Sequence, residues 1–301
     1  AAMLKHKTFA AAAATLLRCR SCYGLAPLST SSRVALPPTL EPFRANIEES
    51  LKPAVVLSPC EEAAQPWSTK LGGVPYRPQG QPWPTRLTSS SADDDDNNLT
   101  FLAQLNFASL PALPDFPRAG ILQFFIYGGC MFYGSYMGTP PDAPPQDTFR
   151  VVWHPDVVEH GLDTTVPFSE DDDDLPHDPT REVPLKGALT KVGLCKMDCN
   201  WDTTLGGESS IKDTEFDEEG YGNEEYNQLF VPGCTKVGGH PTFSQEDPRK
   251  AGSDWVLLFG TDSGSEGLDL EWGDCGVGNF FIQKEDLAKL DFSRVYYMYD
   301  C

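Results

Sequence analysis

The sequence lacks any hydrophobic run that could span a bilayer. Its longest apolar stretch, Thr8 to Leu17, is mostly alanine and reaches only about half of the length that a membrane-spanning helix needs. Basic residues are also scarce, with 23 Lys and Arg against 44 Asp and Glu and a net charge of -21. Because such a surface repels phosphate backbones and anionic lipids, the composition predicts no membrane span and excludes a general nucleic-acid or membrane-surface binder.

Glycine and proline are too few for a collagen or for a wholly disordered chain, with 26 of each among 301 residues. Hydrophobic residues make up 40% of the chain and charged residues 22%, which predicts a soluble protein with a real core. The nine cysteines are an odd number spread over a long chain. They predict free thiols and not the dense disulfide framework of a small secreted domain.

The cysteines also make only a weak case for a redox or metal site. Cys19 and Cys22 form a C-x-x-C pair, but this pair lies in a basic leader and not beside a strand. Five residues could be considered as zinc ligands, namely Cys195, Cys199, Cys234, His240 and Cys275. Only Cys195 and Cys199 are closely spaced, whereas a structural zinc site usually has two such pairs. We therefore predict no metal and no cofactor, and we interpret these cysteines as core thiols.

Residues 1–40 are basic and contain no acidic residue. Ala, Ser, Thr and Leu fill most of the other positions, which is the composition of an organellar transit peptide. We therefore predict a transit peptide or disordered leader over 1–40 and a protein of the mitochondrion or plastid. The alternatives are a secreted protein, with Lys5-His6-Lys7 as the basic start of its signal, and a cytoplasmic protein with a disordered tail.

A helix and two acidic tracts can be placed from local patterns. The spacing of Phe43, Ile47 and Leu51 predicts one amphipathic helix at the start of 41–65, a segment that we assign to this helix and its connection. Like charges that lie close together resist compaction. The acidic tracts therefore predict solvated loops, at 93–96 and 170–174.

The most informative feature is an internal repeat. The sequence Lys-Leu-Gly-Gly-Val-Pro at 70–75 returns as Lys-Val-Gly-Gly-His-Pro at 236–241. Gly-Ile-Leu-Gln-Phe-Phe-Ile at 120–126 returns as Gly-Val-Gly-Asn-Phe-Phe-Ile at 276–282. The number of residues between the two copies is not the same for the two motifs. The difference equals the length of a Ser/Asp/Asn insertion in the first copy, so a longer surface loop explains it.

Each copy predicts a Gly-Gly-x-Pro turn, a buried strand, a connection and a second strand that ends in Phe-Phe-Ile. The sequence therefore predicts a β-rich α+β fold of two pseudo-equivalent repeats, each with a small, mainly antiparallel sheet, and few short helices. We assign 66–301 to a single domain. It consists of repeat one (66–150), a crossing segment with an acidic loop (151–230) and repeat two (231–301).

Six short motifs follow one another in the region 66–301, namely Gly72-Gly73-x-Pro75 with Trp83-Pro84, Phe101-Leu102-Ala103-Gln104-Leu105-Asn106, Leu113-Pro114 with Gly120-x-Leu122-x-Phe124-Phe125, Gly238-Gly239-x-Pro241-x-x-x-Gln245, Trp255-x-Leu257-Leu258, and Trp272-Gly273-Asp274-x-Gly276. This ordered set resembles the YwqG-like family, which is described as a domain of unknown function. The resemblance implies an internally duplicated α+β domain with no agreed activity. Gly260 departs from the family pattern, which tends to have glutamine there, and the acidic loops are insertions.

The candidate ligand or partner groove combines residues of both repeats. Alternation along the strand at 101–107 puts Gln104 and Asn106 on one face, where they either tie loops together or line a cleft. Glycines in the two turns allow a partner backbone to approach closely. The predicted groove residues are Gly72, Gly73, Gln104, Asn106, Gly238, Gly239, His240, Gln245, Asp262, Trp272 and Asp274. The structural alternative is that all of them brace the interface between the repeats.

No combination of nucleophile, base and orienting group emerges, so we assign no catalytic residue. His240 and Asp274 could transfer a proton and Cys275 could act as a nucleophile, but nothing in the sequence brings them together. The other histidines, His154, His160 and His177, form no ligand spacing and are expected at the surface. The favoured interpretation is a non-catalytic binding or scaffolding module with a protein or small-molecule partner. The alternative is a hydrolase-like or ligand-modifying enzyme with its site between the repeats.

Overall fold

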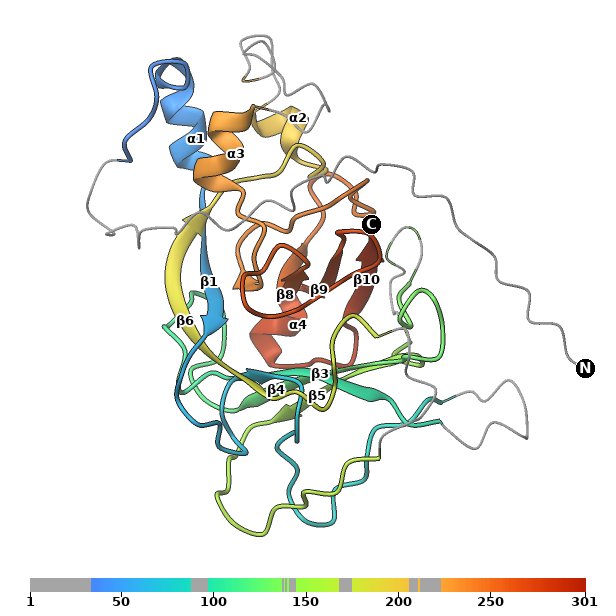
Figure 1. Ribbon diagram of the computed structural model, residues 1–301. Helices are drawn as coiled ribbons and strands as arrows, with labels where there is room; N and C mark the ends of the chain where they lie inside the picture. The colour runs from blue at the N-terminus through green and yellow to red at the C-terminus, as the bar shows by residue number, and fades with distance from the viewer. Residues whose placement is uncertain are drawn as a thin grey trace, which may run out of the picture.

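The computed structural model describes residues 34–87, 97–136, 138, 140, 145–167, 175–205, 211 and 223–301. Residues 1–33 of the predicted leader and both acidic tracts lie outside the described residues. The elements follow one another as shown in Figure 1: η1 (Glu41–Phe43), α1 (Arg44–Ser50), β1 (Lys52–Pro59), β2 (Lys70–Leu71), β3 (Thr100–Asn106), β4 (Ile121–Ile126), β5 (Phe149–His154), β6 (Val183–Val192), α2 (Trp201–Thr204), α3 (Glu224–Phe230), β7 (Lys236–Gly238), β8 (Trp255–Asp262), β9 (Val277–Gln283), α4 (Lys284–Lys289) and β10 (Tyr296–Asp300).

The strands of the described residues form one antiparallel sheet of ten strands, in the order β10-β9-β8-β7-β1-β6-β2-β3-β4-β5. The prediction of two small sheets, one in each repeat, is therefore wrong. β1 precedes the first repeat in the sequence but pairs with β7 of the second, and β6 precedes β7 but pairs with β2 of the first. β1 and β6 also pair with each other, from Lys52 opposite Val192 to Pro59 opposite Leu185. This exchange of strands joins the two halves into one sheet.

The sheet curves until its two ends face each other, so that it is nearly closed into a barrel (Figure 1). The ring of Phe124 in β4 lies 4.6 Å from that of Phe259 in β8. The ring of Phe149 in β5 lies 5.4 Å from that of Tyr297 in β10. Because strands from both ends bury their inner faces against each other, they share one hydrophobic core.

The two halves curve at corresponding places. β3 shifts register against β4 between Phe101 and Ala103, and β8 shifts against β9 between Leu257 and Phe259. A bulge of this kind bends a strand and increases its twist. The matched bulges therefore turn both ends of the sheet toward the common core.

Three helices, α1, α2 and α3, gather at one end of the sheet (Figure 1). Ile47 of α1, Trp201 of α2 and Tyr226 of α3 belong to a second hydrophobic cluster, which holds these helices together. α4 lies apart from them, and its Leu287 joins the main core. The helix predicted near the start of 41–65 is observed as η1 and α1.

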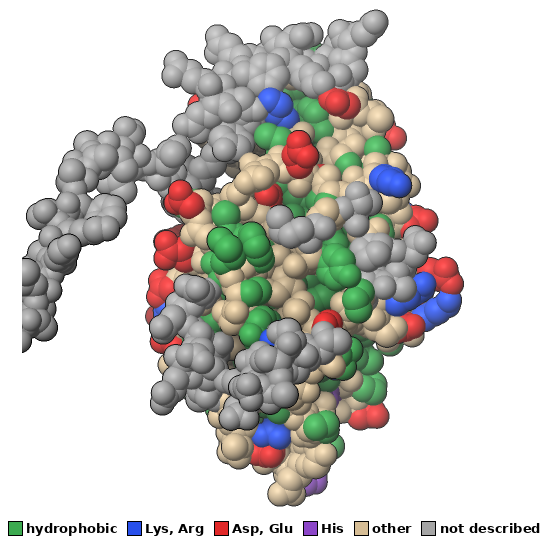
Figure 2. All heavy atoms as spheres, turned by 90° about the vertical axis from the view of Figure 1, so that its right-hand side faces the viewer, with side chains coloured by type: hydrophobic (Ala, Val, Ile, Leu, Met, Phe, Trp, Pro, Cys, Tyr) green, Lys and Arg blue, Asp and Glu red, His purple; other side chains and the backbone are tan. Residues whose placement is uncertain are grey.

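No helix in the part of the chain that the structure describes is long and apolar enough to cross a membrane. Some large hydrophobic side chains are nevertheless exposed, including Leu87, Met131 and Phe132. On the face shown in Figure 2, hydrophobic side chains gather near the middle, and most acidic side chains lie nearer the edges.

Candidate functional site

A buried group of charged side chains lies where two distant loops meet. Asp198 is in the turn before α2, and Asp247 and Arg249 are in the loop between β7 and β8. The side chains of all three are almost inaccessible to solvent. We call these three residues, with the adjacent Cys199 and His240, the Arg249 cluster. Buried charges of this kind are costly unless they are paired, so their partners decide what the cluster can do.

Arg249 holds both carboxylates. Its Nη2 lies 2.6 Å from Oδ2 of Asp247 and 3.0 Å from Oδ2 of Asp198. Its Nη1 donates to the carbonyl oxygen of Trp255 at 3.1 Å, and the guanidinium lies 4.9 Å from the ring centre of Phe281. Burial opposes the charge of Arg249, but the hydrogen bonds to Asp247 and the charge of Asp198 outweigh burial and raise the pKa of Arg249. The cluster therefore keeps a fully paired guanidinium.

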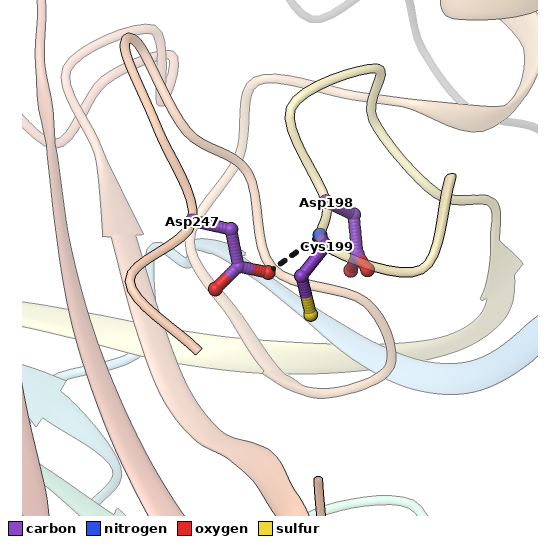
Figure 3. Close-up of side chains that lie close together, drawn as sticks. All are labelled: Asp198, Cys199 and Asp247. Atoms are coloured by element: carbon purple, nitrogen blue, oxygen red, sulfur yellow. Dashed lines mark hydrogen bonds between the residues drawn. The ribbon is translucent and has the colours of Figure 1, made fainter. Parts of the chain in front are cut away.

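Asp198, Cys199 and Asp247 offer three potential metal-ligand atoms within 4.8 Å of one another (Figure 3). Both carboxylates already bind Arg249, and Asp247 also accepts a hydrogen bond from the Cys199 N–H at 2.9 Å. Burial raises the pKa of the Cys199 thiol to about 12, so the sulfur is protonated at neutral pH. Because a metal binds the thiolate, these residues fit a structural tie centred on arginine better than a metal site.

His240 connects the cluster to the end of α1. Its Nε2 lies 2.8 Å from the carbonyl oxygen of Ser50 and therefore donates its proton there. Burial lowers the pKa of His240 to about 4, so the ring is neutral at pH 7. Its Nδ1, which lies 3.8 Å from Oδ2 of Asp198, is then unprotonated and cannot donate to that carboxylate. The arrangement links three segments, and because His240 is only 5% exposed, its unprotonated nitrogen faces Asp198 and not the solvent.

Gln104 and Asn106 tie loops together and do not line a cleft. Gln104 is 0% exposed, and its Oε1 accepts a hydrogen bond from the Tyr76 N–H at 2.8 Å. Its Nε2 donates to two carbonyl oxygens of the segment 66–68, and Asn106 donates to a third in the same segment. These bonds fasten the segment before β2 to β3, and they leave Gln104 unavailable to a ligand at the surface.

The polar network around Gln104 continues into β4 and β5. Nε2 of Gln123 donates to the carbonyl oxygen of Tyr76 at 2.7 Å, and Nε2 of His154 lies 2.8 Å from Oε1 of Gln123. Burial lowers the pKa of His154 to about 4. His154 and His177 are both buried, so the expectation that they lie at the surface is wrong for these two histidines. Their neutral rings fill hydrogen-bonding positions inside the protein, which the sequence spacing could not indicate.

The two Gly-Gly turns pack against the protein's own chain. Gly72 has φ +61°, and a Cβ atom there would lie 2.3 Å from the carbonyl oxygen of Arg181. Gly239 has φ +74°, and a Cβ atom there would lie 2.5 Å from a methyl group of Val192. Only glycine combines this conformation with this space. Gly73 and Gly238 likewise face side chains of the protein, those of Glu182 and Leu113.

The structure distributes the remaining predicted groove residues over several contacts. The backbone N–H of Gln245 donates to Asp300, and Trp272 packs against Tyr133. The carboxylate of Asp262 accepts hydrogen bonds from Thr242 and from the Gly264 N–H. Asp274 is exposed. The contacts described for His240 are with Ser50 and Asp198 and not with Asp274. The proton-transfer pair considered from the sequence is therefore not assembled in this conformation.

Two buried lysines were not among the predicted site residues. Lys70 and Lys236 begin the two copies of the repeated motif, and each is 1% exposed. Nζ of Lys70 lies 2.7 Å from Oε1 of Glu182, and burial lowers the pKa of Lys70. Nζ of Lys236 donates to Oγ1 of Thr242 at 3.5 Å. Their recurrence before each Gly-Gly pair is the signal that could have found them, because lysine is seldom buried without a partner.

An open apolar hollow of about 440 Å³ lies beside β5, the last strand of the sheet. Gln146 holds its walls together, because its Oε1 accepts the Val151 N–H at 2.6 Å and its Nε2 donates to the carbonyl oxygen of Phe292 at 2.5 Å. The rings of Trp153 and Phe292 lie 5.3 Å apart. The lining residues come from three distant parts of the chain and are Leu87, Gln146, Arg150, Val151, Trp153, Phe292 and Ser293.

A family model described as a domain of unknown function, DUF1963, matches residues 69–301. The chain belongs to the DUF1963 family. A comparison with curated proteins found no match. The matched region contains β2 to β10, the Arg249 cluster and every residue of the predicted groove. β1 pairs with both β6 and β7 in the middle of the sheet, but it lies before the DUF1963 match. The narrower resemblance to YwqG-like proteins stays a prediction.

Proposed function

We propose that this protein is a non-catalytic binding module that docks an apolar side chain of a partner protein in the hollow beside β5. The lining of the hollow carries the proposal. Leu87, Val151, Trp153 and Phe292 provide apolar walls, and Leu87 is 66% exposed. Covering this leucine with a partner would stabilise a complex by about 1 to 2 kcal/mol.

The position of the hollow at an edge strand favours recognition by side chains. Among the strands of the described residues, β5 pairs with β4 alone, and an extended peptide could in principle pair with its other edge. The side chain of Gln146, however, already accepts the backbone N–H of Val151. A partner is therefore recognised by what fills the hollow and not by adding a full strand to the sheet.

The buried charged groups support binding in preference to catalysis. Arg249 pairs with both carboxylates of its cluster, the Cys199 thiol is protonated, and the His240 ring is neutral with its proton donated to a carbonyl oxygen. An activated thiol needs a lowered pKa, which Cys199 does not have, and the buried ring of His240 is not accessible to a substrate. Gln104 has no exposed surface, which counts against the predicted groove both as a partner site and as the site of the hydrolase-like alternative. No observation specifically favours that alternative.

Both halves of the fold contribute to the proposed site. The matched bulges of β3 and β8 support an origin of the halves by internal duplication. β5 belongs to the first half, and Phe292, which faces it across the hollow, belongs to the second. The duplicated halves thus act as one scaffold.

Peptides selected by phage display against the whole chain supply a defined ligand for the test, with affinity measured by fluorescence anisotropy. Leu87→Asp is expected to weaken binding about tenfold or more, because it places a charge in the apolar wall. Met131→Asp is the matched control, because Met131 is 70% exposed and does not line the hollow. Equal binding by the wild-type and Leu87→Asp chains would show that the proposal is wrong. So would an equal loss in the control, or a selection that enriches no peptide with an apolar residue.

A further inference from the structure

Among the described residues that line the hollow beside β5, Arg150 is the one charged residue. The other lining side chains are apolar or neutral, whereas the chain as a whole carries a net charge of -21. Docking an apolar side chain does not require a cation at this place. The charge of Arg150 therefore bears on what else the partner presents.

Two hydrogen bonds fix the guanidinium of Arg150 at the hollow. Its Nε donates to the carbonyl oxygen of Gln146 at 3.2 Å, and its Nη2 donates to that of Thr85 at 3.1 Å. Gln146 lines the hollow, and Thr85 lies two residues before Leu87, which lines it as well. The guanidinium is thus held between two segments that form walls of the hollow. Because Arg150 is only half-buried, a partner can reach it from solvent.

The described residues leave part of this guanidinium unused. They accept no hydrogen bond from its Nη1, and none of their carboxylates forms an ion pair with Arg150. The charge of Asp147 acts on Arg150, but Oδ1 of Asp147 accepts the Leu87 N–H at 2.8 Å. Burial lowers the pKa of Arg150, and an arginine side chain still stays protonated at neutral pH. The hollow therefore has a fixed cation at its edge.

We propose that the partner carries an acidic side chain next to its apolar one, and that this carboxylate pairs with Arg150 when the apolar side chain fills the hollow. The proposal rests on the function proposed above and adds the charge of the partner. A carboxylate matches the planar N–H groups of arginine, and such a charge-assisted hydrogen bond is stronger than a neutral one. Phosphate groups are typically recognised by clusters of arginines, and a single arginine suits a carboxylate better.

The backbone around the hollow favours a side-chain carboxylate over the carboxylate at the end of a chain. Proteins that capture a C-terminal carboxylate do so with several backbone N–H groups. The N–H groups of Leu87, Val151 and Ser293, which line the hollow, already donate to Asp147, Gln146 and Asp291. The unused donor is on a side chain, so a partner carboxylate that has rotatable bonds of its own can reach it.

Peptides selected by phage display against the whole chain are the probes, synthesised with amidated C-termini so that only side chains carry carboxylates. In each peptide, the acidic residue nearest the apolar one is replaced by its amide, glutamate by glutamine or aspartate by asparagine. We expect the acidic peptide to bind the wild-type chain about threefold to tenfold more tightly than its amide isostere, as measured by fluorescence anisotropy. With Arg150→Gln, the two peptides should bind equally.

Arg181→Gln is the matched control, because Arg181 is an exposed arginine that does not line the hollow, and it should keep the preference for the acidic peptide. The amide isostere should bind the Arg150→Gln chain as it binds the wild type, which shows that the hollow is intact. Equal binding of both peptides to the wild type overturns the proposal, whatever the variants do. So does an equal preference in the Arg150→Gln chain.

Leu87→Ser separates this proposal from the docking of an apolar side chain, because it shortens the apolar wall without changing the charge. If binding depends on Leu87 but no acidic residue contributes, the pairing with Arg150 is wrong and the apolar docking stands. If binding does not depend on Leu87, both proposals are wrong. Tighter binding by the same amide isostere with a free C-terminus would assign Arg150 to a chain end and overturn the proposed side-chain pairing.

Discussion

Replacing Arg249 with methionine should be among the most destabilising single changes in this protein. Methionine keeps much of the apolar length of the side chain and its packing against Phe281, but it removes the guanidinium. Asp198 and Asp247 would then remain buried without the cation that lies 3.0 Å and 2.6 Å from them. The change therefore tests whether the Arg249 cluster is a structural tie.

The expected loss follows from the burial of the cluster. Removing one partner of a buried ion pair typically lowers the free energy of unfolding by about 3 to 5 kcal/mol, because the remaining charge is left uncompensated. The carbonyl oxygen of Trp255 loses its donor as well. Lys284→Met is the matched control, because Lys284 lies 3.2 Å from Asp254 in an exposed pair. Loss of that pair should change the stability by about 1 kcal/mol or less.

Urea unfolding followed by tryptophan fluorescence gives the free energy of unfolding for each variant. Arg249→Lys guards against a variant too unstable to measure, since it keeps the charge and loses the fork that reaches both carboxylates. The double variant Arg249→Met with Asp247→Asn should recover part of the loss, because it removes one of the two unpaired charges. If Arg249→Met unfolds within about 1 kcal/mol of the wild type, the reasoning about the cluster is refuted. A divalent cation that stabilises the wild type by occupying the carboxylates would refute it as well.

Three further changes test other parts of the fold by the same unfolding measurement. Gly72→Ala should lower the free energy of unfolding clearly more than Gly80→Ala. Both glycines have positive φ, but only the Gly72 position has atoms within 4 Å of the added Cβ. Equal losses of stability in the two variants would contradict the role of close packing. Gln104→Ala should cost about 1 to 3 kcal/mol by leaving buried backbone groups unpaired, and a variant as stable as the wild type would count against the tie. The lowered pKa of His240 means that the unfolded chain binds more protons between pH 4 and 6.5, so stability rises with pH in this window. His240→Gln should reduce that slope by about one proton, and an unchanged slope would show that His240 does not titrate there.

Local patterns in the sequence were sufficient for several elements. Alternation predicts a strand at 101–107, and β3 covers Thr100–Asn106. The strand that ends in Phe-Phe-Ile in each copy is observed as β4 and β9. The periodicity of Phe43 and Ile47 predicts the helix that is observed as η1 and α1. These features depend on neighbouring residues along the chain, so a short stretch of sequence contains the information for them.

β1 shows where local patterns fail. The spacing of Phe43, Ile47 and Leu51 predicts a helix and a connection for its segment, 41–65. In the structure, Pro53 is the second residue of a strand and lies opposite Lys191 of β6. Nothing within this short stretch indicates that it will pair with β6 along one edge and with β7 along the other.

The sequence by itself determined the acidic balance, the glycine turns and the two strands that follow each turn, which are β3, β4, β8 and β9. Each of these is a property of composition or of adjacent residues. Only the tertiary structure decided that β1 and β6 would join both halves in one sheet. The same backbone groups can pair with any neighbouring strand, so the pattern within a strand does not identify its partner. The burial of Arg249 against Asp198, 51 residues away, was likewise decided by the tertiary structure. Loop residues follow no hydrophobic periodicity, so the neighbouring sequence does not indicate which charged side chains they will contact.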